Sequence, residues 1–394
     1  MESDKSSSQI IRKTLTPVLS VVLIDMIAFG MVIPLLPLFA ERFKVSPVYI
    51  GLLFSCYSLL QLLASPVLGA ASDRIGRKPI LVLSLLGTSI GFLITALASS
   101  YWMLLLGRCV DGLTGGNIAT ANSYIADVTE PRNRATSYAL MGAMFGVGLT
   151  LGPLIGGLFA RWSATAPFFF ATVISGANAL YVWACLVEPS ARITSTSSFS
   201  SFFRSGRWPA LQRLLMGNFI FLLGCAIYQV MLALFTQWRY DFDSKDNAYL
   251  FGFLGVIIIV GQGACFPILK RLLSVRELLS VGILFTAGGL ILMSFSASAA
   301  MLLSGVAVSS LGLSFAMPLI SMLVSIGAGE EELGSLFGLN QSTGSFARLV
   351  GPVIGGELFS WRPAATMWVS GIMILLSWIL FSRYMKHPLI STKI

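Results

Sequence analysis

Charged residues are scarce in this 394-residue chain. Asp, Glu, Lys and Arg make up 11% of it, hydrophobic residues make up 56%, and the mean hydropathy is +0.83. Soluble globular domains carry about 25% charged residues. The composition therefore excludes an ordinary soluble protein and indicates a polytopic membrane protein.

Residues that usually carry enzymatic chemistry are also scarce. The single histidine, His387, lies in the C-terminal tail, which argues against a serine triad or a metal site. No Walker sequence is present, so ATP is not the expected energy source. We expect no cofactor, no metal and no enzymatic activity. The cysteines lie in apolar segments without paired spacing and are interpreted as packing residues: Cys56, Cys109, Cys185, Cys225 and Cys265.

Long apolar runs dominate what is present. Runs long enough to cross a bilayer occur at about 14–40, 48–70, 80–99, 101–125, 136–159, 166–187, 210–236, 248–268, 277–296, 299–324, 335–359 and 365–385. We interpret the first as a retained span, because it is too long for a signal-peptide core. An even number of spans puts both termini on one side of the membrane.

The net charge of +9 is explained by topology rather than by nucleic acid, because the basic residues lie in short loops. With a cytoplasmic N-terminus, the inner segments together with the inner ends of the runs at 210–236 and 365–385 hold 18 Lys and Arg residues, and the outer loops hold 6. This bias predicts that both termini are cytoplasmic. The expected location is a cell membrane, inner or plasma.

The chain divides into two similar halves. Between Glu188 and Pro209 the apolar pattern gives way to a Ser/Thr/Arg-rich stretch, which predicts bundles over 1–188 and 210–394 and a cytoplasmic linker over 189–209. The sequence Gly152-Pro-Leu-Ile-Gly-Gly157 recurs 199 residues later as Gly351-Pro-Val-Ile-Gly-Gly356. We therefore predict an all-α protein of twelve transmembrane helices, built as two six-helix bundles related by a pseudo-two-fold axis.

A short charged stretch separates the second and third runs. It contains a basic cluster that marks the cytoplasmic side, an acid that can accept hydrogen bonds, and glycines that permit a tight reversal. The simpler interpretation is a positive-inside loop. The residues concerned are Gly69, Asp73, Arg74, Gly76, Arg77 and Lys78.

The order of residues in this loop resembles the loop signature of the major facilitator superfamily, from which Ala71 departs. The resemblance implies a gate in which Asp127 pairs with Arg77 while Asp73 faces the start of span eleven, near Ser335. The alternative is a set of unrelated surface charges. A second-half counterpart, Lys270 to Arg276, lacks the acid and the glycine.

Asp25 lies near the middle of the first span, where a charge costs at least ~2.5–3.5 kcal/mol unless it has a partner or faces a cavity. A functional role is the default expectation, and a structural hydrogen bond is the alternative. The surrounding stretch, Leu23 to Pro37, resembles the first span of drug/proton antiporters, especially the tetracycline exporters. The resemblance implies that Asp25 takes part in transport.

Arg108 and Asp111 in the fourth span are three residues apart and can pair on one helical face. Arg108 matches a family arginine thought to help proton exchange. Asp111 stands where the family usually has a neutral residue, so it is either the exchangeable site or a counter-charge for Arg108. In the second half, Glu357 is the other candidate for proton coupling, and Arg348 has no counter-ion that the sequence identifies.

The fifth span carries a run of small residues and a proline that resembles the motif distinguishing antiporters within the superfamily. These residues are Gly148, Gly152, Pro153, Gly156 and Gly157. Generic small-residue packing is the alternative, and the copy in span eleven supports it to some extent.

A substrate cavity is expected between the halves, lined by spans one, four, seven and ten among others. Taken singly, such polar and aromatic residues more often make helix–helix contacts. Together, Met, aromatic and amide side chains suit a large amphipathic solute. The candidates are Tyr57, Gln61, Asn117, Asn122, Tyr228, Gln229, Phe315, Met317 and Gln341.

The expected function is secondary active transport, most simply proton-coupled efflux of a lipophilic or amphipathic compound. The alternative is a uniporter or proton symporter for a small organic solute, in which Arg108 binds an anionic group. A non-transporting scaffold does not explain the intramembrane charges. The expected partners are a small-molecule substrate, protons and the lipid bilayer, with no nucleic acid, and the protein is expected to be a monomer.

Overall fold

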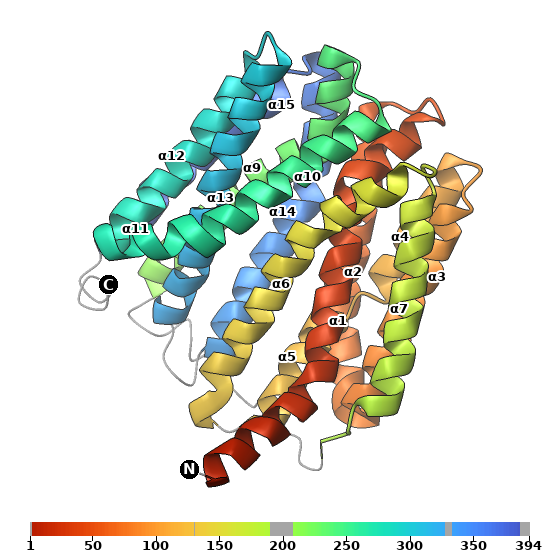
Figure 1. Ribbon diagram of the computed structural model, residues 1–394, viewed down its shortest axis with the longest axis vertical. Helices are drawn as coiled ribbons and strands as arrows, with labels where there is room; N and C mark the ends of the chain where they lie inside the picture. The colour runs from red at the N-terminus through yellow and green to blue at the C-terminus, as the bar shows by residue number, and fades with distance from the viewer. Residues whose placement is uncertain (1, 130, 190–207, 328–332, 387–394) are drawn as a thin grey trace. The chain divides into compact units, whose positions relative to one another are not determined.

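The structure is a computed structural model that describes residues 2–129, 131–189, 208–327 and 333–386. Every regular element in these ranges is a helix (Figure 1). The chain separates into two compact units by its internal contacts. Unit 1 comprises Met1–Val45 and Cys56–Ser195, and unit 2 comprises Ser46–Ser55 and Thr196–Ile394. Most of the predicted linker over 189–209 lies outside the described residues.

The helices follow the twelve predicted apolar runs. The first half contains α1 (Glu2–Glu41), α2 (Pro47–Ile75), α3 (Arg77–Ala96), α4 (Tyr101–Leu113), α5 (Asn117–Val128), α6 (Pro131–Ala160) and α7 (Ala166–Cys185). The second half contains α9 (Trp208–Tyr240), α10 (Ser244–Val260), the π-helix η1 (Gly261–Cys265), α11 (Phe266–Leu272), α12 (Val275–Ser294), α13 (Ala299–Gly327), α14 (Leu333–Trp361) and α15 (Ala365–Met385). Two of the spans are composite, because α4 with α5 forms the fourth and α10, η1 and α11 form the eighth.

Ten of these spans, among the described residues, are long and apolar enough individually to cross a membrane. The fourth falls short because it is broken into helices of 13 and 12 residues. The eleventh, α14, is 29 residues long but contains Arg348, Glu357 and several amide and hydroxyl side chains. Both exceptions are therefore the spans that carry unusual polarity.

The break in the fourth span corrects the sequence prediction of one continuous helix over 101–125. α4 ends at Leu113, and α5 starts at Asn117 after Thr114, Gly115 and Gly116. Glycine is a weak helix former. In addition, the Thr114 hydroxyl donates to the carbonyl oxygen of Val110 (2.9 Å) instead of leaving the turn to backbone bonds alone. The polar face of this span is thus split between two short helices.

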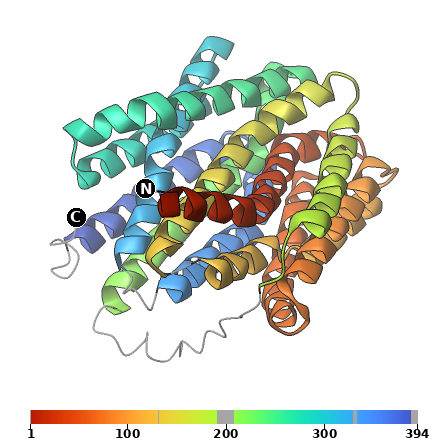
Figure 2. The ribbon, with the colours of Figure 1, turned by 60° about the horizontal axis from the view of Figure 1, so that its bottom comes forward.

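α1 and α6 run side by side in unit 1 (Figures 1 and 2). Their contact depends on missing side chains: a Cβ on Gly148 would lie 2.5 Å from the Met26 Cβ, and one on Gly152 would lie 2.5 Å from the Ile27 carbonyl oxygen. Small residues at this spacing permit such close approach. The predicted fifth-span glycines Gly148 and Gly152 therefore pack against α1 at and next to the turn that contains Asp25.

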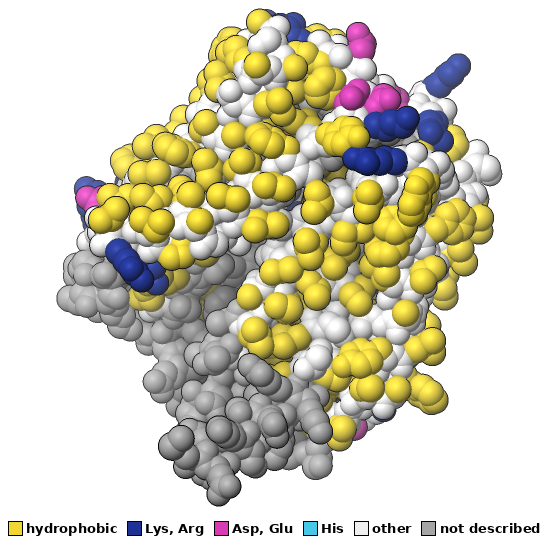
Figure 3. All heavy atoms as spheres, viewed as in Figure 1, with side chains coloured by type: hydrophobic (Ala, Val, Ile, Leu, Met, Phe, Trp, Pro, Cys, Tyr) yellow, Lys and Arg dark blue, Asp and Glu magenta, His cyan; other side chains and the backbone are white. Residues whose placement is uncertain are grey.

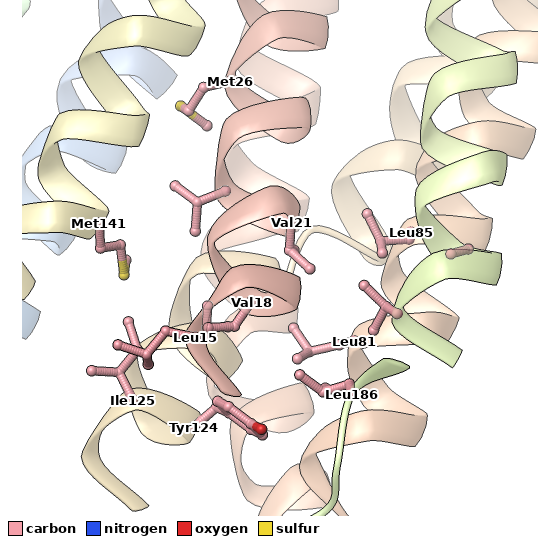
Figure 4. Close-up of a cluster of buried hydrophobic side chains, with 14 residues drawn as sticks. Leu15, Val18, Val21, Met26, Leu81, Leu85, Tyr124, Ile125, Met141 and Leu186 are labelled. Carbon is pink, nitrogen blue, oxygen red and sulfur yellow. The ribbon is translucent and has the colours of Figure 1, made fainter. Parts of the chain in front are cut away.

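An apolar cluster fills one end of unit 1 (Figure 4). It brings together residues of α1, α3, α5, α6 and α7 and the residue that follows α7, and most of its side chains are fully buried. Its largest labelled members are Leu15, Leu81, Leu85, Tyr124, Ile125, Met141 and Leu186. The Tyr124 hydroxyl donates to the Val187 carbonyl oxygen (2.9 Å), which fixes the chain as it leaves α7.

In unit 2, α9 packs against α14 and α15, and α12 packs against α13 and α15. The repeated glycines serve the α9–α14 contact, because a Cβ on Gly351 would lie 2.7 Å from the Ala226 Cβ. The first turns of α2 belong to this unit, where the Ser55 hydroxyl donates to the Leu349 carbonyl oxygen (2.5 Å). The rod formed by α10, η1 and α11 is visible in Figures 1 and 2.

Large apolar side chains are exposed over much of the described surface (Figure 3). Trp102, Trp183 and Val173 are each at least 65% exposed in their helices. Such exposure is costly in water but favourable in lipid. The surface thus agrees with a multi-pass integral membrane protein.

Candidate functional site

Asp25 lies inside unit 1 and contacts the start of α5. Its side chain is 8% exposed, and the Asn117 Nδ2 donates to its Oδ1 at 3.0 Å. Asn117 is the first residue of α5. The break in the fourth span therefore places the Asn117 amide against Asp25 in the first span. The Oδ1 atom of Asn117 is buried without a hydrogen-bond partner among the described residues.

Arg108 and Asp111 form the predicted pair within α4. The Arg108 Nη1 lies 3.1 Å from the Asp111 Oδ2, and both side chains are nearly inaccessible. The guanidinium carbon also lies 4.8 Å from the ring centre of Phe92 and 5.9 Å from that of Tyr57. Aromatic faces attract cations, so these rings add to the pairing. The Arg108 Nε and Nη2 atoms have no hydrogen-bond partner among the described residues.

Close contact between α3 and α4 holds the ion pair in place. A Cβ on Gly91 would lie 2.9 Å from the Asp111 Cβ, and one on Gly107 would lie 2.5 Å from the Thr95 hydroxyl oxygen. Larger residues at these glycines would separate the helices. The sequence thus provides close backbone packing where two opposite charges are buried, which limits the motion of both.

Arg77 lies at the centre of a second charged site, at the junction of α2 and α3. Its Nε lies 2.9 Å from an Asp127 oxygen, its Nη1 lies 2.5 Å from an Asp73 oxygen, and Nη1 also donates to the Ser72 hydroxyl at 2.6 Å. Arg77 is 2% exposed, whereas the Asp73 side chain is 47% exposed. The Arg77–Asp127 contact expected from the loop resemblance is present.

Glycine is required at the turn of this junction. Gly76 has a backbone φ of 131°, a conformation that residues with a side chain rarely adopt. It is the one residue between the end of α2 and the start of α3. The loop is therefore shorter than the sequence suggested, because helix continues through Asp73 and Arg74 to Ile75. Gly69 lies within α2, and Lys78 lies in the first turn of α3.

Glu188 completes this junction and was missed by sequence reasoning. Its two carboxylate oxygens accept the backbone N–H groups of Arg77 (2.7 Å) and Lys78 (2.9 Å). These N–H groups are free at a helix start, and a carboxylate there is favourable. The available signal was an acid at the end of span six, which spacing alone does not connect to α3.

The substrate candidates in unit 1 lie in two groups. Tyr57, Gln61 and Asn117 gather near the buried charges, and the Gln61 Nε2 donates to the Tyr57 hydroxyl at 2.9 Å. The Tyr57 ring also lies 6.0 Å from that of Phe29 on α1. Asn122 is half-buried in the middle of α5, more than one turn beyond Asn117.

The substrate candidates in unit 2 differ in exposure. Tyr228 and Phe315 are buried, Gln229 and Met317 are half-buried, and Gln341 is exposed. No single site among the described contacts brings these five side chains together. Their role in binding remains a prediction.

The two remaining charged candidates lie on α14. Arg348 is half-buried, and its Nη2 lies 3.3 Å from the Ser345 hydroxyl. Glu357 is exposed near the end of the helix. The side chain of Ser335, expected near Asp73, lies outside the described residues. Within the described part of the chain, no group of three His, Cys, Asp or Glu residues is placed to hold a metal ion.

A bundle of membrane-spanning helices with ionised groups in its interior, joined to a second bundle with the same repeated glycine motif, is the architecture of a secondary transporter. The Major Facilitator Superfamily model matches residues 18–352, and the chain belongs to this family. It is therefore a transporter and not an enzyme.

Several characterised relatives are similar over nearly the whole chain. The class E tetracycline resistance protein of Escherichia coli is 30% identical over 393 residues, covering 95% of this chain and 96% of the relative. The class D protein of Salmonella ordonez is 30% identical over 364 residues, covering 90% and 92%. These matches confirm the resemblance to tetracycline exporters.

Solved structures support the twelve-span, two-bundle fold. A bacterial homologue of the human lysosomal transporter Spinster has a TM-score of 0.76 at 15% identity, covering 94% of this chain and 96% of its own. The human organic anion transporter MFSD10 has a TM-score of 0.72 at 24% identity, covering 94% and 99%.

Proposed function

We propose that this protein is a proton-coupled exporter of a lipophilic or amphipathic small molecule that works by alternating access. The observation that carries the proposal is the pair of buried acids, Asp25 and Asp111, in one helical bundle. Asp25 is held by an amide, whereas Asp111 is held by a cation. Two acids with different partners provide one group that can exchange a proton and one that stays neutralised.

The cost of charge in a membrane gives this arrangement a transport role. An unpaired carboxylate there costs several kcal/mol, so its protonation state and its access to water are linked. A change in the position of α1 relative to α5 alters the Asp25–Asn117 contact, which makes proton binding depend on conformation. One proton crossing 100 mV supplies about 2.3 kcal/mol to drive the substrate.

The Arg77 junction is proposed as the gate on the cytoplasmic side. Arg77 is buried and bonded to two acids and a hydroxyl, and these bonds tie α2, α3 and α5 together. Both termini are then cytoplasmic, and the protein lies in a cell membrane as a monomer. The fifth-span glycines let α1 and α6 move as closely packed neighbours.

A lipophilic or amphipathic substrate is supported by two observations. Relatives with 30% identity are tetracycline resistance proteins. The residues around the buried charges include Phe29, Tyr57 and Gln61, which present aromatic surface beside an amide. Tetracycline is therefore the first probe to use.

Transport driven by a proton gradient tests the proposal. Reconstituted wild-type protein should accumulate tetracycline in vesicles with an acidic interior. Asp25→Asn should lose this accumulation but still exchange labelled for unlabelled tetracycline. Glu41→Gln, at the end of the same helix, is the matched control and should behave as wild type. Undiminished accumulation by Asp25→Asn refutes the role of Asp25.

A second candidate function is uniport or symport of a small organic anion. The observation in its favour is that the Arg108 Nε and Nη2 atoms lack a described partner. A solved structure with the same fold is named an organic anion transporter. Para-aminohippurate uptake that is saturable and lost in Arg108→Gln would favour this candidate over the first. Uptake that ignores a pH gradient would indicate uniport, and uptake driven by protons that move in the same direction would indicate symport.

A further inference from the structure

Two cysteine sulfurs face each other between α2 and α4. The Sγ atoms of Cys56 and Cys109 lie 3.2 Å apart, and both residues are half-buried. The sulfurs of a disulfide are about 2.05 Å apart, so these two need to approach by only about 1 Å. Sequence spacing gave no indication of this pair, because 53 residues separate the two cysteines.

The backbones of α2 and α4 approach each other closely beside this pair. A Cβ on Gly112 would lie 3.2 Å from the Tyr57 Cα and 2.7 Å from its carbonyl oxygen. Cys56 directly precedes Tyr57, and Cys109 lies one helical turn before Gly112. Glycine thus brings the two helices together beside the thiols, and disulfides need closely spaced Cα atoms.

The position of Cys56 along α2 is also informative. Residues Ser46–Ser55 group with unit 2, whereas Cys56 is the first residue of α2 that groups with unit 1. The part of α2 that follows Cys56 contacts the fourth span, because Cβ atoms on Gly115 and Gly116 would meet Gln61 and Leu68. Cys56 therefore marks where α2 changes its packing partner.

We propose that Cys56 and Cys109 form a modification site, a thiol pair that a membrane-permeant thiol oxidant converts to a disulfide that fixes α2 to α4. Diamide, an azo compound, is a suitable oxidant. One thiol adds across its N=N bond, and the second sulfur then attacks the first and displaces a hydrazine. The two thiol hydrogens end on the two nitrogens, so the sulfurs are oxidised and diamide is reduced.

The bond would act on the buried charged cluster. Tyr57 follows Cys56, Arg108 precedes Cys109, and the Tyr57 ring already lies 5.9 Å from the Arg108 guanidinium. A disulfide between Cys56 and Cys109 would hold the Tyr57–Arg108 contact and prevent α2 from sliding along α4. The thiol chemistry is independent of what the protein transports, whereas inhibition of transport by the bond rests on the proposed function.

Thiol counting on the purified full-length protein tests the site. The number of free thiols per molecule should fall from five by two after diamide treatment. Peptide mass spectrometry should detect a Cys56–Cys109 cross-link, and a non-reducing gel should show a monomer band. Neither Cys56→Ser nor Cys109→Ser should form this link, whereas Cys225→Ser should still form it. Cys56→Ala is the substitute if thermal unfolding shows that the serine variant is unfolded. Unchanged thiols, or a link through other cysteines, overturn the proposal.

Transport then tests the consequence. Diamide should abolish tetracycline exchange by the wild type in proteoliposomes, dithiothreitol should restore it, and Cys109→Ser should resist the oxidant. A disulfide that forms while exchange continues overturns the claim that the bond fixes a moving contact. If untreated wild type does not exchange tetracycline, the proposed function fails for this probe, and the thiol count still decides the site.

Discussion

The helices α6 and α14 carry the same Gly-Pro-x-Ile-Gly-Gly sequence 199 residues apart, and both use it to approach a neighbour. α6 packs on α1, and α14 packs on α9. The neighbours differ in chemistry: α1 contains Asp25 opposite this contact, whereas α9 contains no charged residue in the corresponding turns. The glycine motif for close helix packing is therefore present in both halves, whereas the intramembrane acid on the neighbouring helix is present only in the first.

Buried polar groups show the same difference. The buried charged side chains in the described part of the chain are those of Asp25, Arg77, Arg108, Asp111 and Asp127, all in unit 1. The described hydrogen bonds of unit 2 that are fully buried are neutral, as in Thr236–Asn247 (2.6 Å) and Tyr384–Leu323 (3.2 Å). Neutral bonds hold helices together without coupling them to protons, so we assign the proposed proton coupling to unit 1.

The largest expected difference between the units concerns their intramembrane arginines. Arg108→Ala leaves Asp111 buried without its cation, which should destabilise the protein by about 3–5 kcal/mol. Arg348→Ala removes a half-buried side chain that contacts a hydroxyl and should cost much less. Thermal and denaturant unfolding in detergent measure both.

Arg108→Ala combined with Asp111→Ala is the control, because it removes both charges. The double variant should be more stable than Arg108→Ala alone. Equal stability of these two variants would show that an unpaired Asp111 costs nothing, and the contrast between the units would lose its basis.

The matched glycines sharpen the comparison next. Gly152→Ala forces a methyl group against the backbone of α1, whereas Gly351→Ala meets the Ala226 side chain. A Cβ at position 152 meets three backbone atoms of α1 at 2.5–2.9 Å, whereas one at position 351 meets a single atom closer than 3.0 Å, the Ala226 Cβ. Overpacking costs about 1–3 kcal/mol, so Gly152→Ala should be the more destabilising. Unfolding midpoints of the two variants measure the difference. The reverse order would contradict the assigned packing.

Two helix starts provide a smaller contrast. The start of α3 is held by Glu188 from another segment, whereas α12 is capped locally by Ser274 and Glu277. Glu188→Ala should weaken the α3 start by about 1 kcal/mol and speed hydrogen exchange at Arg77 and Lys78. Glu277→Ala should affect only its own turn. Glu188→Gln should restore part of the protection, and a failure to do so would indicate that charge alone is responsible.

The smallest effect concerns pH at the start of α10. Backbone N–H groups of Asp246 and Lys245 donate to the Asp243 carboxylate and lower its pKa below the usual range. Because the folded-state pKa is depressed, this stabilisation is present above the ordinary carboxyl pKa and is lost as pH falls through the folded-state value. The melting-temperature difference between wild type and Asp243→Asn should therefore shrink on acidification. A difference that grows at low pH would contradict this cap.

Much of the fold could be predicted from sequence because spans are long apolar runs with a simple length requirement. The twelve runs and the Arg108–Asp111 pair needed only local spacing, and the repeat needed only a comparison of the sequence with itself. The break after Leu113 was missed because the length of an apolar run marks a span whether or not its helix is interrupted, here at Thr114, Gly115 and Gly116. Tertiary contacts from α2 and α3 decide that turn.

The parts of the site that were missed involve residues distant in sequence. Glu188 reaches α3 across 111 residues, Asn117 reaches Asp25 across 92, and Phe92 stacks on Arg108 from another helix. Hydropathy reports depth in the membrane and not which faces meet. No spacing rule separates the wall of a cavity from a helix–helix contact, so the substrate candidates in unit 2 stay predictions.

Direct measurement of proton movement tests the central claim that coupling chemistry lies in unit 1. Proteoliposomes containing a trapped pH indicator should report protons leaving an acidic interior when tetracycline enters through the wild type. With Asp25→Asn, tetracycline exchange should continue without that proton flux. An unchanged proton flux in Asp25→Asn would contradict the account and direct attention to Glu357 and the second bundle.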